Sequence, residues 1–355
     1  MTPLLEVRNL KKVFPVGRGD ELVAVDDVSL QLHRGEVLGI VGESGCGKST
    51  LSRLIARLID PTSGDLEFDG RSLLTYPLAA FSRAPARRRI QMVFQDATDS
   101  LNPRFTAFDC IADPVRRLAP CDKEQLQQLV ELAAERVGLA RELLVRRPHQ
   151  LSGGQKARVG IARAIALDPS LLILDEPTSA LDVSVQSVVL KTLAKLRDEL
   201  GLAYVFISHD LKVVELLSDR VAVMYLGRVV EIGPTAAIFG RALHPYTVGL
   251  AAARPSIAPP GERVVRQRLE GESSSPINPN PHQCHFASRC ARVHPRCLTE
   301  APVLRHSTPT ADLKDACIDH RDGQQTSHDP VGDAISQLHW VACHFPHDDP
   351  LQEER

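Results

Sequence analysis

Hydrophobic and polar residues alternate over the first part of the chain, as they do in half-buried strands. Residues 5–10, 22–25 and 28–32 each carry this two-residue period. Residues 37–41 form a continuous apolar run, and residues 49–59 then follow a helical spacing that ends at Pro61 and Gly64. The pattern predicts short strands, then a buried strand that leads through a glycine-rich loop into a helix.

The composition turns helical from about residue 77 to residue 148. Asp122 is placed to cap a helix that Gly138 would end. The apolar stripe of this helix consists of Leu126, Leu129, Val130, Leu132 and Ala133. We therefore predict a helical insertion at 77–148.

Helices and strands alternate regularly between residues 152 and about 233. The pattern predicts a helix through residue 167, a strand at 171–174, a helix at 183–200, a strand at 203–207 and one more helix. This alternation is typical of an α/β fold, in which helices wrap a central, largely parallel sheet.

The character of the chain changes after Gly240. Residues 254–281 are rich in proline, serine and charge, which predicts a linker or an exposed arm. Residues 281–355 are rich in histidine and cysteine but poor in large apolar side chains. We therefore expect something other than apolar burial to hold this last part together.

Length, charge and cysteine usage narrow the class of protein. A chain of 355 residues has room for two or three structural units, and its net charge of −2 offers no general attraction to nucleic acid or anionic lipid. The chain contains no apolar run of eighteen residues, and its start lacks the pattern of a secretory signal. We therefore expect a cytoplasmic protein without a nucleic-acid partner, in which the eight cysteines are thiols or metal ligands.

The glycine-rich loop matches the phosphate-binding pattern G-x-x-x-x-G-K-[ST]. Its glycines let backbone N–H groups turn inward, Lys48 reaches the β- and γ-phosphates, and the Ser49 hydroxyl binds Mg²⁺. We expect Cys46 to be a small space-filling side chain. The predicted ATP-binding residues here are Gly42, Glu43, Ser44, Gly45, Cys46, Gly47, Lys48, Ser49 and Thr50.

Polar residues that follow three apolar runs predict the hydrolytic chemistry. Asp175 and Glu176 follow the strand at 171–174, so Asp175 is a ligand for Mg²⁺ and Glu176 a base for the attacking water. Gln95 ends another apolar run, from which it reaches Mg²⁺ and the water. His209 follows the strand at 203–207 and is placed to contact the γ-phosphate.

A second phosphate-binding pattern is the pentapeptide LSGGQ at 151–155. Its serine and two glycines stand at a helix start, where N–H groups and the helix dipole favour an anion. One molecule does not need two such sites. We therefore expect Ser152, Gly153, Gly154 and Gln155 to contact ATP bound to another copy or a paralogue, with two nucleotides sandwiched between two domains.

Taken together and in this order, these motifs resemble the nucleotide-binding subunit of an ABC transporter over residues 4 to about 250. The resemblance implies a RecA-like P-loop core with a helical subdomain. It also gives roles to Asp182, in a dimer-interface segment SALD, and to Phe14, where the family stacks an aromatic ring on adenine. SLNPR at 100–104 and HPYT at 244–247 are similar to the oligopeptide and dipeptide importer subfamily.

The cysteine tail is a candidate metal site. Cys284, Cys290 and Cys297 are followed by Cys317 and Cys343, and four thiolates suit an iron–sulfur cluster or a structural zinc. Unliganded thiols are the third interpretation. The subfamily resemblance implies a [4Fe-4S] cluster, and we choose Cys343 as its fourth ligand, with Cys317 as the rival.

The sequence thus predicts an ATPase at 1–240, with an oligopeptide-transporter-type extension at 241–355, that powers import of peptides or similar solutes. Its expected partners are a second ATPase subunit, two transmembrane permease subunits and, indirectly, an extracytoplasmic solute-binding protein. The expected location is the cytoplasmic face of the inner membrane, and we expect the segment from Gln95 to about Arg117 to touch the permeases. The alternatives are a soluble ABC-type ATPase acting on ribosomes or DNA, and an iron–sulfur redox sensor that binds nucleotide.

Overall fold

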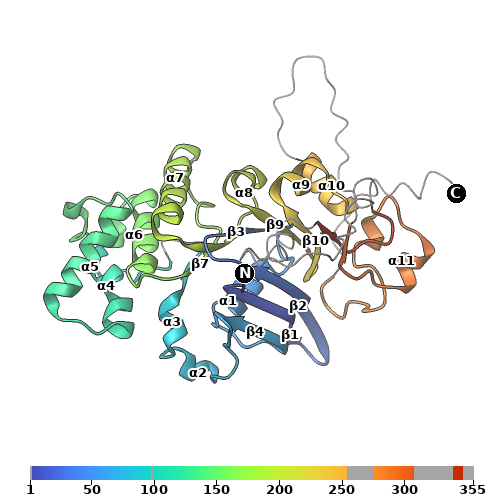
Figure 1. Cartoon of the computed structure of the whole chain (residues 1–355), viewed down its shortest axis with the longest axis horizontal. Coiled ribbons are helices and arrows are strands. Elements are labelled where there is room, and N and C mark those ends of the chain that lie inside the picture. Colours follow the sequence, from blue (N-terminus) through green and yellow to red (C-terminus); the bar gives the residue numbers. More distant parts are fainter. Residues whose placement is uncertain (1, 97–98, 254–274, 308–338, 347–355) are drawn as a thin grey trace, which may run out of the picture.

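A computed structural model of the chain describes residues 2–96, 99–253, 275–307 and 339–346. Its main feature is an eight-stranded sheet with the order β11-β12-β10-β9-β3-β8-β7-β6 (Figure 1). The strands from β9 to β6 are parallel, and β10, β12 and β11 continue the sheet in antiparallel pairs. The strands are β3 (Val37–Val41), β6 (Ile90–Val93), β7 (Leu171–Asp175), β8 (Ala203–Ile207), β9 (Arg220–Tyr225), β10 (Arg228–Pro234), β11 (Arg305–His306) and β12 (Trp340–Val341).

The central strands are buried because both faces of the sheet are covered. Alternate residues of β7 and β8 point to opposite sides, as the two-residue period of a strand requires. Leu172 and Tyr204 join a core with α6 (Gly153–Ile165) and α7 (Val183–Leu200), whereas Ile173 and Val205 join a second core with α1 (Lys48–Ile55). Continuous apolar strands are the expected sequence of such a sheet, so the predicted α/β class is confirmed.

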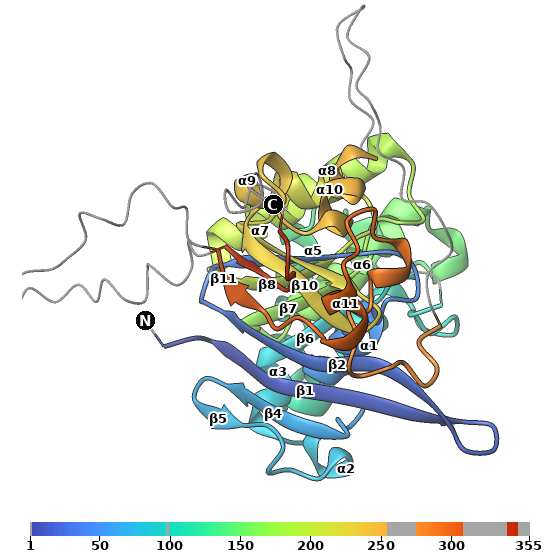
Figure 2. The ribbon, with the colours of Figure 1, turned by 90° about the vertical axis from the view of Figure 1, so that its right-hand side faces the viewer.

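A smaller antiparallel sheet packs against the α1 side of the large one, in the order β2-β1-β4-β5 (Figure 2). Its strands are β1 (Leu5–Val16), β2 (Asp20–Leu32), β4 (Ser63–Phe68) and β5 (Arg71–Ser72). The two strands predicted at 22–25 and 28–32 are one strand, β2. Its register against β1 shifts between Val25 and Val28, around Asp27, whose φ is 56°.

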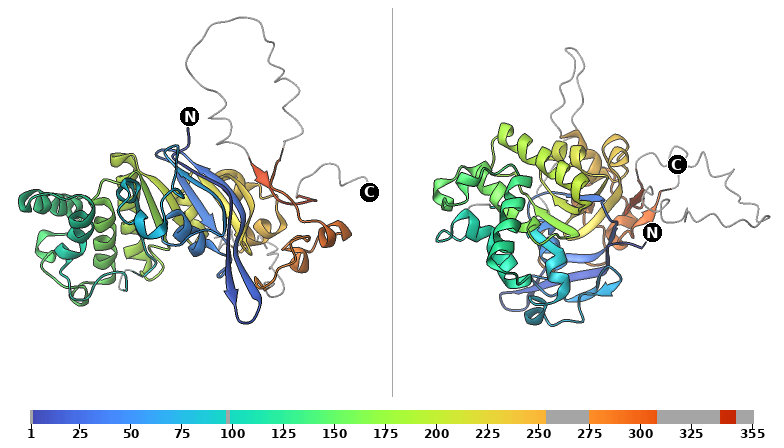
Figure 3. Two further views of the ribbon diagram at one scale, coloured as in Figure 1. Left: turned by 90° about the horizontal axis from the view of Figure 1, so that it is seen from below. Right: turned by 60° about the vertical axis from the view of Figure 1, so that its left-hand side comes forward.

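The helical part lies at one end of the molecule and packs on α6 (Figures 1 and 3). Its main helices are α4 (Ala107–Leu118) and α5 (Lys123–Arg136), preceded by α2 (Leu78–Phe81) and α3 (Pro85–Arg89). Asp122 caps α5 through a reciprocal capping box with Gln125, as its position predicted. The predicted range 77–148 also contains β6, which is a strand of the large sheet, so the range is not helical throughout.

After α8 (Leu211–Leu217) and α9 (Thr235–Gly240), the chain enters α10 (Pro245–Ala252) and then an irregular extension with α11 (Pro295–Thr299), β11 and β12. Phe286 of the extension is 2% exposed and belongs to the main core. Apolar burial therefore contributes to residues 281–355, for which the sequence led us to expect another source of stability. Most of the predicted linker lies outside the described residues, but Pro276 and Asn278 bond to the β1–β2 hairpin.

Candidate functional site

The predicted phosphate loop connects β3 to α1, with Gly47 as the N-cap of the helix. At two positions of this loop, a residue with a side chain would be strained and would collide with neighbouring backbone. Gly42 has φ of 153° and Gly47 φ of 105°, and a Cβ atom would stand 2.2 Å from the Met224 carbonyl oxygen and 2.1 Å from that of Ala24, respectively. Ser44 and Gly45 are exposed, whereas Thr50 lies in the first turn of α1. The loop thus wraps closely against neighbouring backbone while its tip stays open.

The Lys48 side chain folds back over this loop. Its Nζ donates hydrogen bonds of 2.8 Å to the carbonyl oxygens of Gly42 and Glu43, and the residue is only 6% exposed. Cys46 is buried beside it, and burial raises the pKa of this thiol. An ammonium held at a glycine-rich loop that leads into a helix start is suited to bind an anion.

Asp175 lies opposite the start of α1 at the end of β7. The hydroxyls of Ser49 and Ser52 donate to its two carboxylate oxygens at 3.2 and 3.3 Å. Burial raises the pKa of Asp175 above its ordinary value, against the effect of these bonds. A buried carboxylate of this kind gains from a nearby cation. Sequence reasoning missed Ser52, although its position one turn after Ser49 on the same helix face is the signal that identifies it.

Glu176, Gln95 and His209 come together although they follow three different strands. Gln95 Nε2 donates to Glu176 Oε2 at 3.1 Å, and His209 Nδ1 lies 3.1 Å from the same oxygen. The backbone of Glu176 has φ of 47°, an uncommon conformation for a residue with a side chain. Because β6, β7 and β8 are parallel neighbours, their carboxyl ends meet at one edge of the sheet, where such folds place ligands.

Ser152 and Gly154 lie at the start of α6. This helix lies on the side of the helical part of the molecule, away from α1 (Figure 1). The Ser152 hydroxyl accepts from the Gln155 N–H, and the Gln155 side chain accepts from the Ser152 N–H. A Cβ on Gly153 would stand 3.3 Å from Leu181, and one on Gly154 2.4 Å from a methyl of Val185. The glycines therefore allow close packing on the start of α7.

Two further predicted residues have local partners. Asp182 caps α7 by accepting from the Val185 N–H at 2.9 Å, and it also accepts from the Ser184 hydroxyl. Phe14 is partly exposed in the long β1–β2 hairpin, with the Lys12 ammonium 5.0 Å from its ring centre. Neither contact occupies the whole side chain, so both residues keep surface for a ligand or a partner.

The extension reaches the phosphate loop at Glu43. The Glu43 N–H donates to the Tyr246 hydroxyl at 2.9 Å, and Arg289 donates to both carboxylate oxygens at 2.8 and 3.0 Å. Tyr246 lies in a buried aromatic group with Tyr225 and Phe286. Neither Tyr246 nor Arg289 was predicted to lie at this site, because no local pattern indicates a contact across 200 or more residues.

The four selected cysteines of the tail line one small cavity, together with Phe286 and Phe345. Burial, and then the neighbouring thiols, raise the pKa of Cys284 to about 11 and that of Cys343 to about 12. Within the described ranges, no group of three or more histidine, cysteine, aspartate or glutamate side chains is arranged to hold a single metal ion. Cys317 lies outside the described residues.

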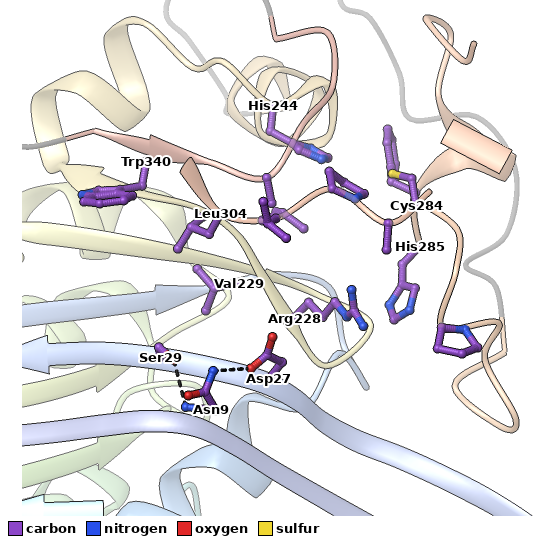
Figure 4. Close-up of a pocket in the computed structure, with 17 residues that line it drawn as sticks. Asn9, Asp27, Ser29, Arg228, Val229, His244, Cys284, His285, Leu304 and Trp340 are labelled. Carbon is purple, nitrogen blue, oxygen red and sulfur yellow. Dashed lines mark hydrogen bonds between the residues drawn. The ribbon is translucent and has the colours of Figure 1, made fainter. Parts of the chain in front are cut away.

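A larger cavity, of about 490 Å³, opens between the small sheet, β10 and the extension (Figure 4). Asn9 forms part of its wall, bonded to Asp27 at 2.7 Å and to Ser29 at 2.9 Å. Trp340 and Leu304 line the apolar side. None of the predicted ATP-binding residues lines this cavity, so size alone does not mark the phosphate site.

Comparison with known proteins decides the family. A family model described as ABC transporter matches residues 25–179, and one described as oligopeptide/dipeptide transporter, C-terminal region, matches residues 230–297. A probable peptide ABC transporter ATP-binding protein of Sinorhizobium fredii is 48% identical over 85% of this chain and 86% of its own. The chain belongs to the ABC transporter ATP-binding proteins.

Other members of this family are similarly close. The dipeptide transport ATP-binding protein DppF of Haemophilus influenzae and the oligopeptide transport ATP-binding protein OppF of Escherichia coli are each 45% identical over 86% of this chain, and they are covered over 94% and 93% of their lengths. The protein is thus an ABC-type ATPase that binds ATP. Among the described residues, no helix is long and apolar enough to cross a membrane.

Solved structures agree with the fold. The ATP-binding cassette MJ0796, determined as a dimer in a post-hydrolysis state with ADP and Pi, superposes with a TM-score of 0.60 at 29% identity. It covers 65% of this chain and 98% of its own. The protein cbiO1 of Clostridium perfringens, part of the ABC transporter complex cbiONQ, gives a TM-score of 0.59 at 30% identity, over 68% of this chain and 92% of its own. The two solved structures therefore match about two thirds of this chain.

Proposed function

We propose that this ABC ATPase powers the import of peptides or similarly sized solutes. The support comes from the relatives, whose names state peptide, dipeptide and oligopeptide transport, and from the C-terminal region that this chain shares with such transporters. In this proposal residues 1–240 form the ATPase domain and residues 241–355 its transporter-specific extension. The observation that carries the proposal is the presence of both parts in one chain.

The proposed chemistry begins with the phosphate loop and Lys48, which bind the phosphates of ATP. Glu176 Oε2 then accepts a proton from the attacking water, while Gln95 and His209 hold the carboxylate from two sides. These contacts fix the direction of the base, and His209 is 62% exposed, so its ring remains accessible to the γ-phosphate. The products are ADP and inorganic phosphate.

Ser49, Asp175 and Gln95 are the proposed holders of Mg²⁺, which when bound neutralises charge on the phosphates. The Ser49 hydroxyl and the Asp175 carboxylate already lie within 3.2 Å of each other, and the raised pKa of Asp175 indicates a group that a cation would stabilise. Hard oxygen ligands of this kind suit Mg²⁺.

The second half-site is proposed to come from another ATPase subunit, either a copy or a paralogue. Ser152, Gly153, Gly154 and Gln155 would contact the γ-phosphate there, with Asp182 at the interface and Phe14 on the adenine. ATP would then close the two subunits on each other, and hydrolysis would reopen them. The segment from Gln95 to Arg117 would pass this motion to two permease subunits. The ATPase subunits would lie at the cytoplasmic face of the membrane. A solute-binding protein would deliver the solute on the other side.

Cys284, Cys290, Cys297 and Cys343 are the proposed ligands of a [4Fe-4S] cluster. Support comes from the one cavity that all four line. A single zinc would draw its thiolates to about 3.8 Å from one another, as tetrahedral bonds of about 2.3 Å require. Four cysteine thiolates are the ligand set that a [4Fe-4S] cluster would need, and these four residues would hold it. Bound iron and sulfide that are lost in Cys343→Ser and kept in Cys317→Ser would support this ligand set.

The importer is tested by purifying the tagged chain from membranes with its companion polypeptides and placing the complex in lipid vesicles. We expect the rate of ATP hydrolysis to rise when a peptide-loaded binding protein is added. The variant Lys48→Ala is the control and should be inactive. Co-purification of two integral-membrane polypeptides is part of the expected result. An ATPase that purifies with ribosomes or DNA, without such polypeptides, would contradict the proposal.

A further inference from the structure

Glu43 is the point at which the extension holds the phosphate loop. Its N–H donates to Tyr246, and its carboxylate receives both Arg289 bonds. Its carbonyl oxygen accepts from Lys48 Nζ at 2.8 Å and from the Cys46 N–H at 3.3 Å. All three polar parts of this residue are therefore occupied, two by the extension and one by the loop. We refer to Tyr246 and Arg289 as the brace.

The brace residues are themselves held firmly. The Arg289 side chain is 6% exposed, and its guanidinium lies 5.8 Å from the ring centre of Tyr225. Tyr246 is fully buried, with ring centres 4.8 Å from Tyr225 and 5.5 Å from Phe286. Tyr225 is the last residue of β9, a strand next to β3, which leads into the loop. The brace is therefore anchored in the large sheet as well as in the extension.

We infer that Tyr246 and Arg289 are positioning residues for ATP binding, which set the conformation of the phosphate loop through Glu43. This inference rests on the proposed assignment of the loop as the nucleotide site. If the loop is already ordered before ATP binds, binding does not have to supply the free energy of ordering it, and the affinity for ATP is higher. The brace donates to and accepts from Glu43 at the phosphate loop, and its ring contacts are with Tyr225 and Phe286, so it is placed to act on binding rather than on the chemical step at Glu176.

The size of the effect follows from the kind of contact. A bidentate, charge-assisted pair with one partner almost fully buried is stronger than an exposed ion pair. Loss of such a pair corresponds to roughly a tenfold change in an equilibrium constant. We expect Arg289→Gln to raise the Kd for nucleotide by about this factor. Tyr246→Phe removes a single acceptor, so we expect about a two- to threefold rise.

The coupling must also act in the opposite direction. If the extension favours nucleotide binding, then nucleotide stabilises the contact with the extension by the same free energy. We therefore expect ATP to slow amide hydrogen exchange in residues 284–299. A residue that only supports the fold would not make this segment respond to a ligand at the loop.

The experiment uses the full-length chain with Mg²⁺ and the fluorescent nucleotide mant-ATP. The variants are Arg289→Gln, Tyr246→Phe and Arg289→Lys, which keeps the charge but not the paired geometry. Arg296→Gln is the matched control, because Arg296 also makes a two-bond pair in the extension, with exposed Glu300, away from the loop. We expect Arg289→Gln to raise the Kd and the KM for ATP about tenfold, with kcat within about twofold. Arg289→Lys should be intermediate, and Arg296→Gln unchanged.

Two further results complete the test. In the double variant Glu43→Gln/Arg289→Gln, the second substitution should add little, because both act through one contact. The exchange of residues 284–299 should respond to mant-ATP in the natural chain and not in Arg289→Gln. Equal Kd values for the natural chain, Arg289→Gln and Tyr246→Phe would overturn the proposed positioning role of the brace. Absence of mant-ATP binding to the natural chain would instead overturn the assignment of the nucleotide site.

Discussion

Replacing Glu231 with glutamine tests how the extension is tied to the large sheet. Glu231 lies in β10 and is fully buried. Its carboxylate accepts from the N–H groups of Leu243 and His244 at 2.8 and 2.9 Å, and His339 Nε2 lies at 2.6 Å. One side chain thus joins the start of α10 to the segment that enters β12. In glutamine, an NH₂ group replaces one of the two accepting oxygens and faces a donor.

The cost can be estimated from these bonds. Loss of a hydrogen bond to a charged acceptor costs about 1.5–3 kcal/mol, and a buried donor left without an acceptor costs a similar amount. The variant also avoids burying a charge, which offsets part of this loss. We therefore expect Glu231→Gln to lower the free energy of unfolding by about 2–3 kcal/mol.

Urea unfolding of the natural chain and the variant measures this difference, with fluorescence of the single tryptophan, Trp340, as a probe in β12 itself. Hydrogen exchange in residues 243–252 should become faster in the variant, because the anchored helix start is released. Glu300→Gln, at an exposed ion pair of the same extension, is the control and should not change stability measurably. A loss of less than about 1 kcal/mol in Glu231→Gln would refute the reasoning.

Three further predictions concern the phosphate site and its surroundings. Glu176→Gln should retain ATP binding while hydrolysis falls by about 100-fold or more, because the base is lost; unchanged turnover in a phosphate-release assay would remove Glu176 from this role. Gly42→Ala should abolish measurable mant-ATP binding, because the added Cβ meets the Met224 carbonyl oxygen at 2.2 Å, and normal affinity would show that the loop can shift. Burial lowers the pKa of His244 from 6.5 to about 4, so the folded chain resists its protonation and stability falls as the pH drops from 6.5 towards 4. His244→Asn, which keeps an acceptor for the Tyr246 N–H, should flatten this part of the pH profile by up to about 3 kcal/mol, and an unchanged profile would exclude His244 as the cause.

The ATPase core was predictable because its signals are local. A continuous apolar run followed by a glycine loop identified β3 and the start of α1, and the helix at 183–200 agrees with α7 in both bounds. Asp122 and its capping box show the same principle on a smaller scale, since a cap depends on residues three positions apart. Gln95, Glu176 and His209 were each expected to act on the nucleotide or the water, and their mutual contact is a finding of the structure, because parallel strands end at a common edge.

The contacts of the extension were not predictable in the same way. Arg289 and Glu43 are separated by 246 residues, and Glu231 and His339 by 108. Nothing in the period of apolar residues indicates which distant partner a polar side chain meets. The low apolar content of the tail also gave no sign that the tail takes part in the core, because this contact too is made with distant residues. A single residue, Phe286, inserts into a core that the rest of the chain supplies.

The position of β12 at the margin of the large sheet has a consequence for shortened forms of the protein. β12 pairs with β10 at Val341 opposite Glu231 and Trp340 opposite Ile232, and β11 then pairs with β12. Cleavage before residue 339 would leave the backbone of β10 without these partners. An edge strand with unpaired N–H and C=O groups can pair with a strand of another molecule. Proteolytic trimming of the tail should therefore produce self-association before it produces unfolding.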